Sequence, residues 1–192
     1  MKLEKLFDLP NGNVTYLMGD FVVCCIPSQN GIWHIGHFDR RAFDSIRENT
    51  ILLLRNESFQ FAAKVGVGFS VKSQCISDNG TFAFSVHRDP DADMAAIIVM
   101  NSHHEEIFRL NTTTHLTSCS LSESGEYLAL SFSRSRNKDD HYSNRLEVIN
   151  LETGEVTSSL CKGNDLMYSD VIVMEPFGNV IAFNQGKSFK VC

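Results

Sequence analysis

One local pattern recurs along the chain and limits the folds open to it: a glycine, a polar residue and then a short apolar run. Four copies begin at Gly19, Gly80, Gly125 and Gly178 and read GDFVVC, GTFAFS, GEYLAL and GNVIAF. Glycine is typical of a turn that needs positive φ, so each copy predicts a hairpin whose second strand follows the glycine. That second strand is apolar on both faces, which indicates a sheet covered on both sides.

The spacing of the copies favours a particular arrangement of sheets. The glycines are 61, 45 and 53 residues apart, and repeats of ~40–50 residues with four short strands are typical of propeller blades. Residues 115–160 contain a full set, with strands expected at 115–121, 126–133, 145–150 and 155–160. A polar loop over 134–144 joins the second strand of this set to the third.

Two runs within this segment carry a resemblance to a known family. Residues 120–129 read SLSESGEYLA and resemble the FSPDGKYLA run of WD-repeat and related propellers, and residues 148–155, VINLETGE, resemble their VWDLxTGK run. The match is good across 115–160 and fair across 70–110, but the WD dipeptide and the GH pair are missing. The resemblance implies a divergent propeller with a binding role, and it implies no chemistry.

We therefore predict a single all-β domain over residues 1–192, a small β-propeller-like ring of four blades. The last blade is one strand short, and a strand over 2–8 is expected to complete it and close the ring. Residues 39–48 lack strand alternation and predict a short helical insert. The predicted blades are 13–55, 70–111, 115–160 and 168–191 plus 2–8. A half-ring that dimerises to eight blades and a non-propeller repeat or sandwich are the alternatives.

The net charge limits the classes of binding partner, and the targeting signals limit the cellular compartment. Seventeen basic against 23 acidic residues give a net charge of −6, which is unfavourable for binding nucleic acid or an anionic membrane. Neither a signal peptide nor an apolar run near the ~20 residues of a membrane span is present. We expect a cytoplasmic protein whose six cysteines are reduced. No C-x-x-C pair occurs, and we expect no metal and no cofactor.

Two polar loops form the candidate interaction site. Both join second to third strands in consecutive blades, so alternating strand direction places them on one ring face. Their mixed charge suits a protein partner better than a nucleic acid, although plain solvated loops are the alternative. The candidate interaction residues are Arg88, Asp89, Asp91, Asp93, Arg134, Arg136, Asp139, Asp140 and His141.

Three further groups of residues are candidate sites. The aspartates at 89, 91 and 93 resemble the start of a calcium loop, but Met94 and Met100 stand where glycine and glutamate are expected. His103 and His104 are adjacent, so they point to opposite faces and favour a polar turn over a metal site. The stretch 33–37 with its tryptophan and two histidines reads either as a ligand surface or, as we favour, as packing.

These patterns favour a binding role over catalysis. The chain has no G-x-S-x-G elbow, phosphate-cradling glycine loop or paired-carboxylate motif. We expect a non-enzymatic protein-interaction module, monomeric or homodimeric, that presents loops from a propeller-like scaffold. The alternatives are a propeller that binds a small ligand or metal ion, and a hydrolase that uses the central channel.

Overall fold

The computed structural model describes residues 3–41, 47–67, 69–88, 95–135, 139–160, 170–175, 178–184 and 187–190. These residues form antiparallel sheets and no helix, as predicted for an all-β chain. The strands are β1 (Leu3–Asp8), β2 (Val14–Met18), β3 (Phe21–Pro27), β4 (Trp33–Arg41), β5 (Arg47–Arg55), β6 (Ser58–Val67), β7 (Phe69–Ile76), β8 (Phe82–Arg88), β9 (Ala95–Met100), β10 (Glu106–Thr112), β11 (Leu116–Leu121), β12 (Tyr127–Phe132), β13 (Arg145–Asn150), β14 (Val156–Leu160), β15 (Asp170–Met174), β16 (Asn179–Asn184) and β17 (Lys187–Lys190).

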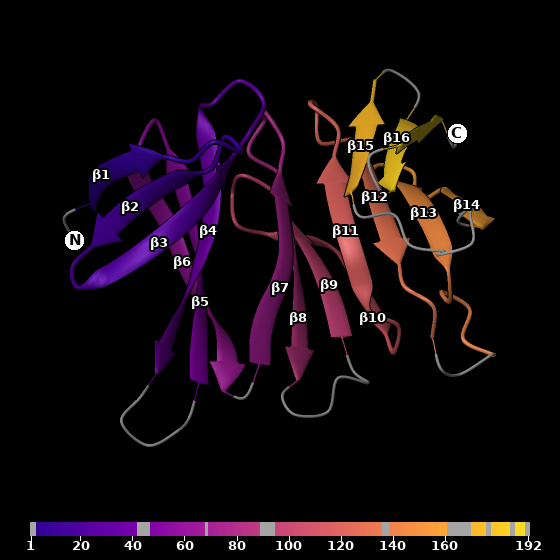
Figure 1. The fold of residues 1–192 in the computed structure, drawn as a ribbon, viewed down its shortest axis with the longest axis horizontal. Coiled ribbons are helices and arrows are strands. Elements are labelled where there is room, and N and C mark those ends of the chain that lie inside the picture. The colour runs from indigo at the N-terminus through magenta and orange to yellow at the C-terminus, as the bar shows by residue number, and fades with distance from the viewer. Residues whose placement is uncertain are drawn as a thin grey trace.

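The strands form four sheets that follow one another along the chain. Sheet A holds β1–β6, sheet B β7–β10, sheet C β11–β14 and sheet D β15–β17, and each is a simple meander. The sheets succeed one another along the long axis, and the two ends of the chain lie at opposite ends of that axis (Figure 1). The arrangement is propeller-like, but the sheets do not close into a ring.

The glycine turns that join β3 to β4, β7 to β8 and β11 to β12 share one hydrogen-bond pattern. In each turn the glycine amide donates to the carbonyl of a serine three residues earlier. The glycines are Gly31, Gly80 and Gly125, all with positive φ. The first turn with this hydrogen-bond pattern is therefore at Gly31 and not at Gly19, which lies in the β2–β3 turn.

The turns also bond to one another across neighbouring sheets. The Asn30 amide of sheet A donates to Asp78 Oδ1 of sheet B at 2.8 Å, and the Asp78 amide donates to the Glu123 carbonyl of sheet C at 3.0 Å. The Ser124 amide then donates to Glu175 Oε1 of sheet D at 2.6 Å. Hydrogen bonds from Ser124 hold the pKa of Glu175 below its ordinary value. One row of turns thus links all four sheets.

Gly80 and Gly178 lie too close to an aromatic ring of the neighbouring sheet to carry a side chain. A Cβ on Gly80 would lie 2.6 Å from Trp33 Cε2, and a Cβ on Gly178 would lie 2.6 Å from Tyr127 Cδ1. Both residues have positive φ as well. The glycine therefore serves the contact between sheets in addition to the turn.

Sheet A is buried on both faces because it curls over itself. Ile35 and Leu53 face sheet B and pack with its apolar side chains. Leu52 and Leu54 point the opposite way and pack against Tyr16 and neighbouring residues of β2 and β3. The strands β1–β3 thus cover the end of the stack that faces away from sheet B.

The N-terminal strand does not complete the last sheet, and that prediction was wrong. Residues 3–8 pair with β2 in sheet A, and sheet D contains β15–β17 among the described residues. The turn that joins β1 to β2 is short, so their pairing loses much less chain entropy than pairing with a strand near residue 190.

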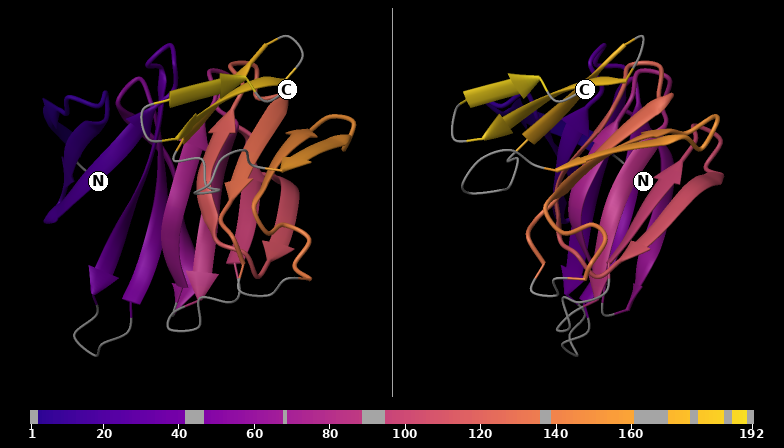
Figure 2. Two further views of the ribbon diagram at one scale, coloured as in Figure 1. Left: turned by 45° about the vertical axis from the view of Figure 1, so that its right-hand side comes forward. Right: turned by 90° about the vertical axis from the view of Figure 1, so that its right-hand side faces the viewer.

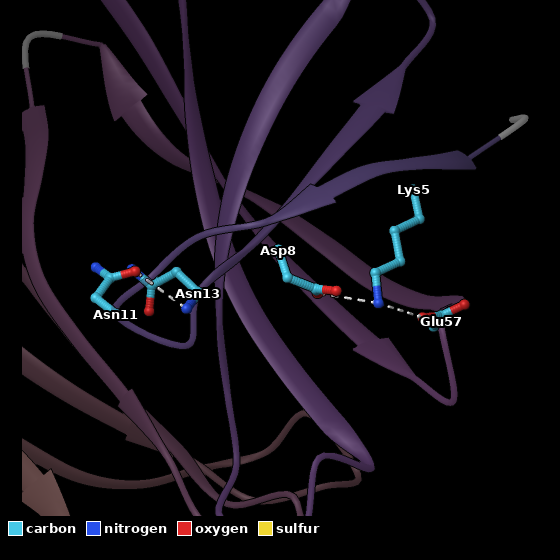
Figure 3. A network of polar contacts seen from close by, with 5 residues as sticks. All are labelled: Lys5, Asp8, Asn11, Asn13 and Glu57. Atoms are coloured by element: carbon cyan, nitrogen blue, oxygen red, sulfur yellow. Dashed lines mark hydrogen bonds and ion pairs between the residues drawn. The ribbon is translucent and has the colours of Figure 1, made fainter.

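A polar contact holds β1 in place on the curled sheet. Lys5 Nζ lies 3.0 Å from Asp8 Oδ1 and 3.5 Å from Glu57 Oε1 in the β5–β6 turn, as Figure 3 shows. In the turn that joins β1 to β2, the Asn13 amide donates to Asn11 Oδ1. Lys5 therefore links the first strand of sheet A to the hairpin at its far edge.

The predicted helical insert near 39–48 is also wrong at the residues of this range that the structure describes. Residues 39–41 continue β4 and residues 47–49 belong to β5, and the two segments pair in register. Residues 42–46 lie outside the described residues. Pairing between two long strands decides the local structure here, because β propensity depends strongly on cross-strand partners.

Sheets B, C and D pack face to face through apolar side chains. Ala83, Ile97 and Val99 of sheet B pack against Leu128 and Leu130 of sheet C. The opposite face of sheet C packs against sheet D in a second cluster. No described helix is long and apolar enough to cross a membrane.

The contact at Gly80 predicts a position-specific loss of stability. Gly80→Ala and Gly154→Ala both force alanine into positive φ, at about 1–2 kcal/mol each. Only Gly80→Ala adds an overlap, because open space surrounds Gly154. We expect Gly80→Ala to lose about 1–3 kcal/mol more free energy of unfolding in urea titrations. Equal losses would contradict the close contact with Trp33.

The adjacent cysteines of β3 predict different reactivity. Cys24 is exposed, whereas Cys25 is fully buried. Burial raises the pKa of the Cys25 thiol to about 12, and the thiolate is the reactive form. Iodoacetamide at pH 8 should modify Cys24 well before Cys25, as followed by peptide mass spectrometry. Equal labelling rates in the folded protein would show that β3 is not packed as described.

Candidate functional site

A pocket of about 650 Å³ lies on the face of sheet B that points toward sheet A, bordered by Val65 of β6 and by residues 140–142 of the β12–β13 loop, and we call it the A–B pocket. Its lining is mostly apolar on one side and polar on the other. The apolar residues are Val65, Phe69, Val86, Ala95, Ala96 and Ile98, and the polar group consists of Arg109, Asn111, Thr112, Thr113, Asp140, His141 and Tyr142.

The register of sheet B explains the apolar side. Ala96 lies between Val86 of β8 and Asn111 of β10, and Ile98 lies beside Arg109. Opposed residues in an antiparallel pair share a face, so these side chains all point toward sheet A. The single methyl of Ala96 fills little of the space between the two sheets, which leaves room for the pocket.

Asp140 supplies a negative charge from sheet C. Thr113 Oγ1 donates to Asp140 Oδ2 at 2.7 Å and the Tyr142 amide donates to Asp140 Oδ1 at 3.0 Å. Burial acts to raise the pKa of Asp140, but the hydrogen bonds from Thr113 and the Tyr142 amide outweigh it and hold the pKa below its ordinary value. The carboxylate is therefore ionised at neutral pH and ties the β12–β13 loop to the end of β10.

The aromatic residues beside Asp140 are packed together. The Tyr142 ring lies 5.1 Å from the Phe132 ring, and the His141 ring meets Tyr142 edge-on at 5.0 Å. Burial raises the pKa of Tyr142, with Glu147 and Asp140 adding to the effect. Tyr142 thus keeps its hydroxyl proton at neutral pH.

Arg109 places a cation on the other polar part of the lining. Its Nε and Nη2 donate to Glu106 at 2.9 and 2.5 Å. This bidentate contact lowers the pKa of Glu106 and fixes the plane of the guanidinium. The pocket therefore combines an apolar wall with one fixed anion and one oriented cation.

The reactive groups of the lining are those of Asp140, His141, Tyr142 and two threonines. The described lining contains no cysteine, serine or lysine that could act as a nucleophile. Asp140 already accepts several hydrogen bonds, which makes it a weak base. Within the described ranges, no group of three or more His, Cys, Asp or Glu residues is placed to hold a metal ion.

The structure brings part of the predicted site to this pocket. Asp140 and His141 line it, whereas Arg134 and Asp139 are exposed on the same loop and Arg88 ends β8. The ends of β8 and β12 lie at the same end of the molecule (Figure 1). Asp89, Asp91, Asp93 and Arg136 lie outside the described residues. That these residues bind a partner stays a prediction.

Sequence reasoning missed the part of the pocket that sheet B supplies. Arg109 and Asn111 alternate with apolar residues along β10, a period that already places both on one face. The sequence does not show which sheet packs against this face of β10. Ile98 and Ala96 were recognised as strand residues, but a cavity beside them depends on the distance between two sheets.

The tryptophan and the other histidines singled out in the sequence lie outside the A–B pocket, and most of them contact neighbouring side chains. Trp33 is buried with the Arg55 guanidinium 5.2 Å from its ring. His37 Nδ1 lies 3.3 Å from Gln74 Oε1, and the His104 ring stacks on Phe61 at 4.3 Å. His103 and its neighbour form the turn between β9 and β10.

Comparisons with known proteins bear on the fold. No protein-family model and no curated protein matches the chain. The β-propeller domain of the Trilobed protease from Pyrococcus furiosus, described as having an open velcro topology, matches with a TM-score of 0.52 and 14% identity over 92% of this chain and 58% of that chain. KlHsv2 with loop 6CD replaced by a Gly-Ser linker matches with a TM-score of 0.51 and 13% identity over 98% of this chain and 65% of that chain.

The chain adopts a β-propeller-like fold. It spans less than two thirds of the length of each of these two structures. At this level of identity the likeness establishes the fold and does not extend to membership of the WD-repeat family or to an activity.

Asp140 predicts a pH-dependent contribution to stability. Asp140→Asn removes the charge that the surrounding donors stabilise, and we expect a loss of about 0.5–1.5 kcal/mol at pH 7. Because the folded-state pKa is lowered, this stability is present above the ordinary carboxyl pKa and is lost as pH falls through the folded pKa. Thermal unfolding between pH 3 and 7 should show the two proteins converging at acid pH.

The matched control for this comparison is Asp20→Asn, in the exposed β2–β3 turn. Its difference from the wild type should be small at every pH, because surface substitutions usually change stability within ~0.5 kcal/mol. A constant difference between Asp140→Asn and the wild type down to pH 3 would contradict the proposed role of the charge.

Proposed function

We propose that the chain is a non-enzymatic protein-interaction module, and that it binds an extended segment of a partner with an apolar side chain in the A–B pocket. The observation that carries this proposal is the pocket itself, about 650 Å³ with an apolar wall of six residues. Apolar anchors in such pockets supply much of the energy of protein interfaces.

The charges on the lining specify the partner further. Asp140 is ionised and fixed, so it favours a basic side chain or a backbone amide beside the anchor. Arg109 is already paired with Glu106, which leaves Asp140 as the dominant charge. A partner segment with an aliphatic or aromatic residue next to a lysine or arginine fits this pattern.

The polar loops extend the proposed contact beyond the pocket. Residues 88–93 and 134–143 contain both signs of charge, which favours selectivity for one protein partner over others. The net charge of −6 argues against nucleic acid, and action in the cytoplasm belongs to the same proposal. We propose that the interaction residues predicted from the sequence belong to the margin of this same surface.

A small-molecule ligand is the second candidate. The pocket volume falls within the ~300–1,000 Å³ typical of small-molecule sites, which are also largely apolar with a few placed polar groups. Such a ligand would combine an apolar body with a group that donates hydrogen bonds to Asp140.

The test selects peptides from a random display library on the wild-type protein and measures their affinity for pocket variants. Ala96→Trp fills the pocket from its apolar wall, and we expect at least a ~10-fold loss of affinity. Selected peptides should share an apolar residue beside a basic one. Val22→Trp is the matched control, because Val22 is 63% exposed on β3 and away from the pocket.

Two outcomes separate the candidates. Peptides that bind the wild type and Ala96→Trp equally would show that the pocket is not the interaction site. If selection yields no peptide, and small-molecule fragments detected by NMR lose binding in Ala96→Trp, the small-ligand candidate replaces the first.

A further inference from the structure

The face of sheet D that points away from sheet C is apolar and exposed. Ile172 and Met174 of β15 are 46% and 47% exposed, and Ile181 of β16 lies directly opposite Ile172 on the same face. Val171 and Val173 point to the other face and are buried against sheet C. A sheet with one face in water normally alternates apolar and polar residues, but β15 does not.

The other sheets show how unusual this face is. Sheet B is covered by sheets A and C, and sheet C by sheets B and D. Sheet A covers its own distal face with β1–β3. Among the described residues, the outer face of sheet D is therefore the one sheet face that continues the stacking pattern without a neighbour. Sheet D and β1 lie toward opposite ends of the long axis (Figure 1), and sheet D projects to one side of the other sheets in the right-hand view of Figure 2.

We propose that this face binds the same face of a second copy of the chain, with the two copies related by a two-fold axis. The stack already buries apolar sheet faces against one another three times, so a fourth such contact continues an existing mode of packing. Pairing of this face with itself is isologous and gives a closed dimer, whereas a head-to-tail contact with the exposed apolar residues of β1 and β3, Leu6, Phe7 and Val22, would give oligomers that keep growing.

The surroundings of the face are compatible with self-association. A shallow hollow of about 310 Å³ lies on sheet D and is lined by Met174, Asn179 and Ile181 together with one acid, Glu175, and one base, Lys190. The hollow thus carries no excess of either charge, although the whole chain is net negative. Two copies can bring their apolar residues together without opposing like charges.

The experiment measures the molar mass of the purified chain by sedimentation and light scattering over a range of concentrations. The wild type should show a monomer–dimer equilibrium. Ile172→Glu places a charge at the centre of the interface and should raise the dimer dissociation constant at least ~100-fold. Val156→Glu is the matched control, since Val156 is also exposed (53%) but lies on the outer strand of sheet C, and it should dimerise like the wild type.

Amide hydrogen exchange of the wild type provides a second test that uses no variant, so its result does not depend on whether the variants fold. Between dilute and concentrated samples, amides of β15 and β16 should gain protection while those of β14 should not. A monomer at all concentrations, larger oligomers that keep growing, or equal dissociation by Val156→Glu would each overturn the proposal. Failure here leaves the peptide selection unaffected, because the A–B pocket lies on other sheets.

Discussion

The row of hydrogen bonds between turns is the constraint on which the stacking of the sheets depends. Each bond joins the turn of one sheet to the next, from Asn30 to Asp78, from Asp78 to Glu123 and from Ser124 to Glu175. Apolar contacts between sheets are not directional, so they favour stacking without fixing its register. The turn bonds are directional and add that register.

The sequence was informative wherever a local rule had a single solution. Positive φ at Gly80 and Gly125 and apolar strands after them correctly predicted hairpins and stacked sheets. The first copy was placed at Gly19 because its flanking residues fit equally well. The serine three positions before Gly31, whose amide and carbonyl both bond within the turn, distinguishes this turn from the one at Gly19.

The pairing of the N-terminal strand and the presence of the pocket could not be predicted from local sequence rules. The segment 3–8 has apolar and charged residues compatible with either edge, and its choice of β2 depends on loop entropy and on Lys5 reaching Glu57. For the site, charge and loop length pointed to Asp140 and His141. The apolar wall from Phe69 to Ile98 belongs to a core-like surface, and its exposure depends on the gap between two sheets.

The stack of sheets has a consequence for how the molecule loses its structure. Each sheet contacts its immediate neighbours, so cooperativity is transmitted along one dimension, as in repeat proteins. In an isolated chain, sheet A is protected at its free end by its own curl, whereas sheet D rests on sheet C alone. Opening should therefore begin at sheet D and spread toward the N-terminus, with β4, β5 and β7 as the slowest-exchanging segment. Direction of unfolding is thus built into the different ways the two ends of the stack are covered.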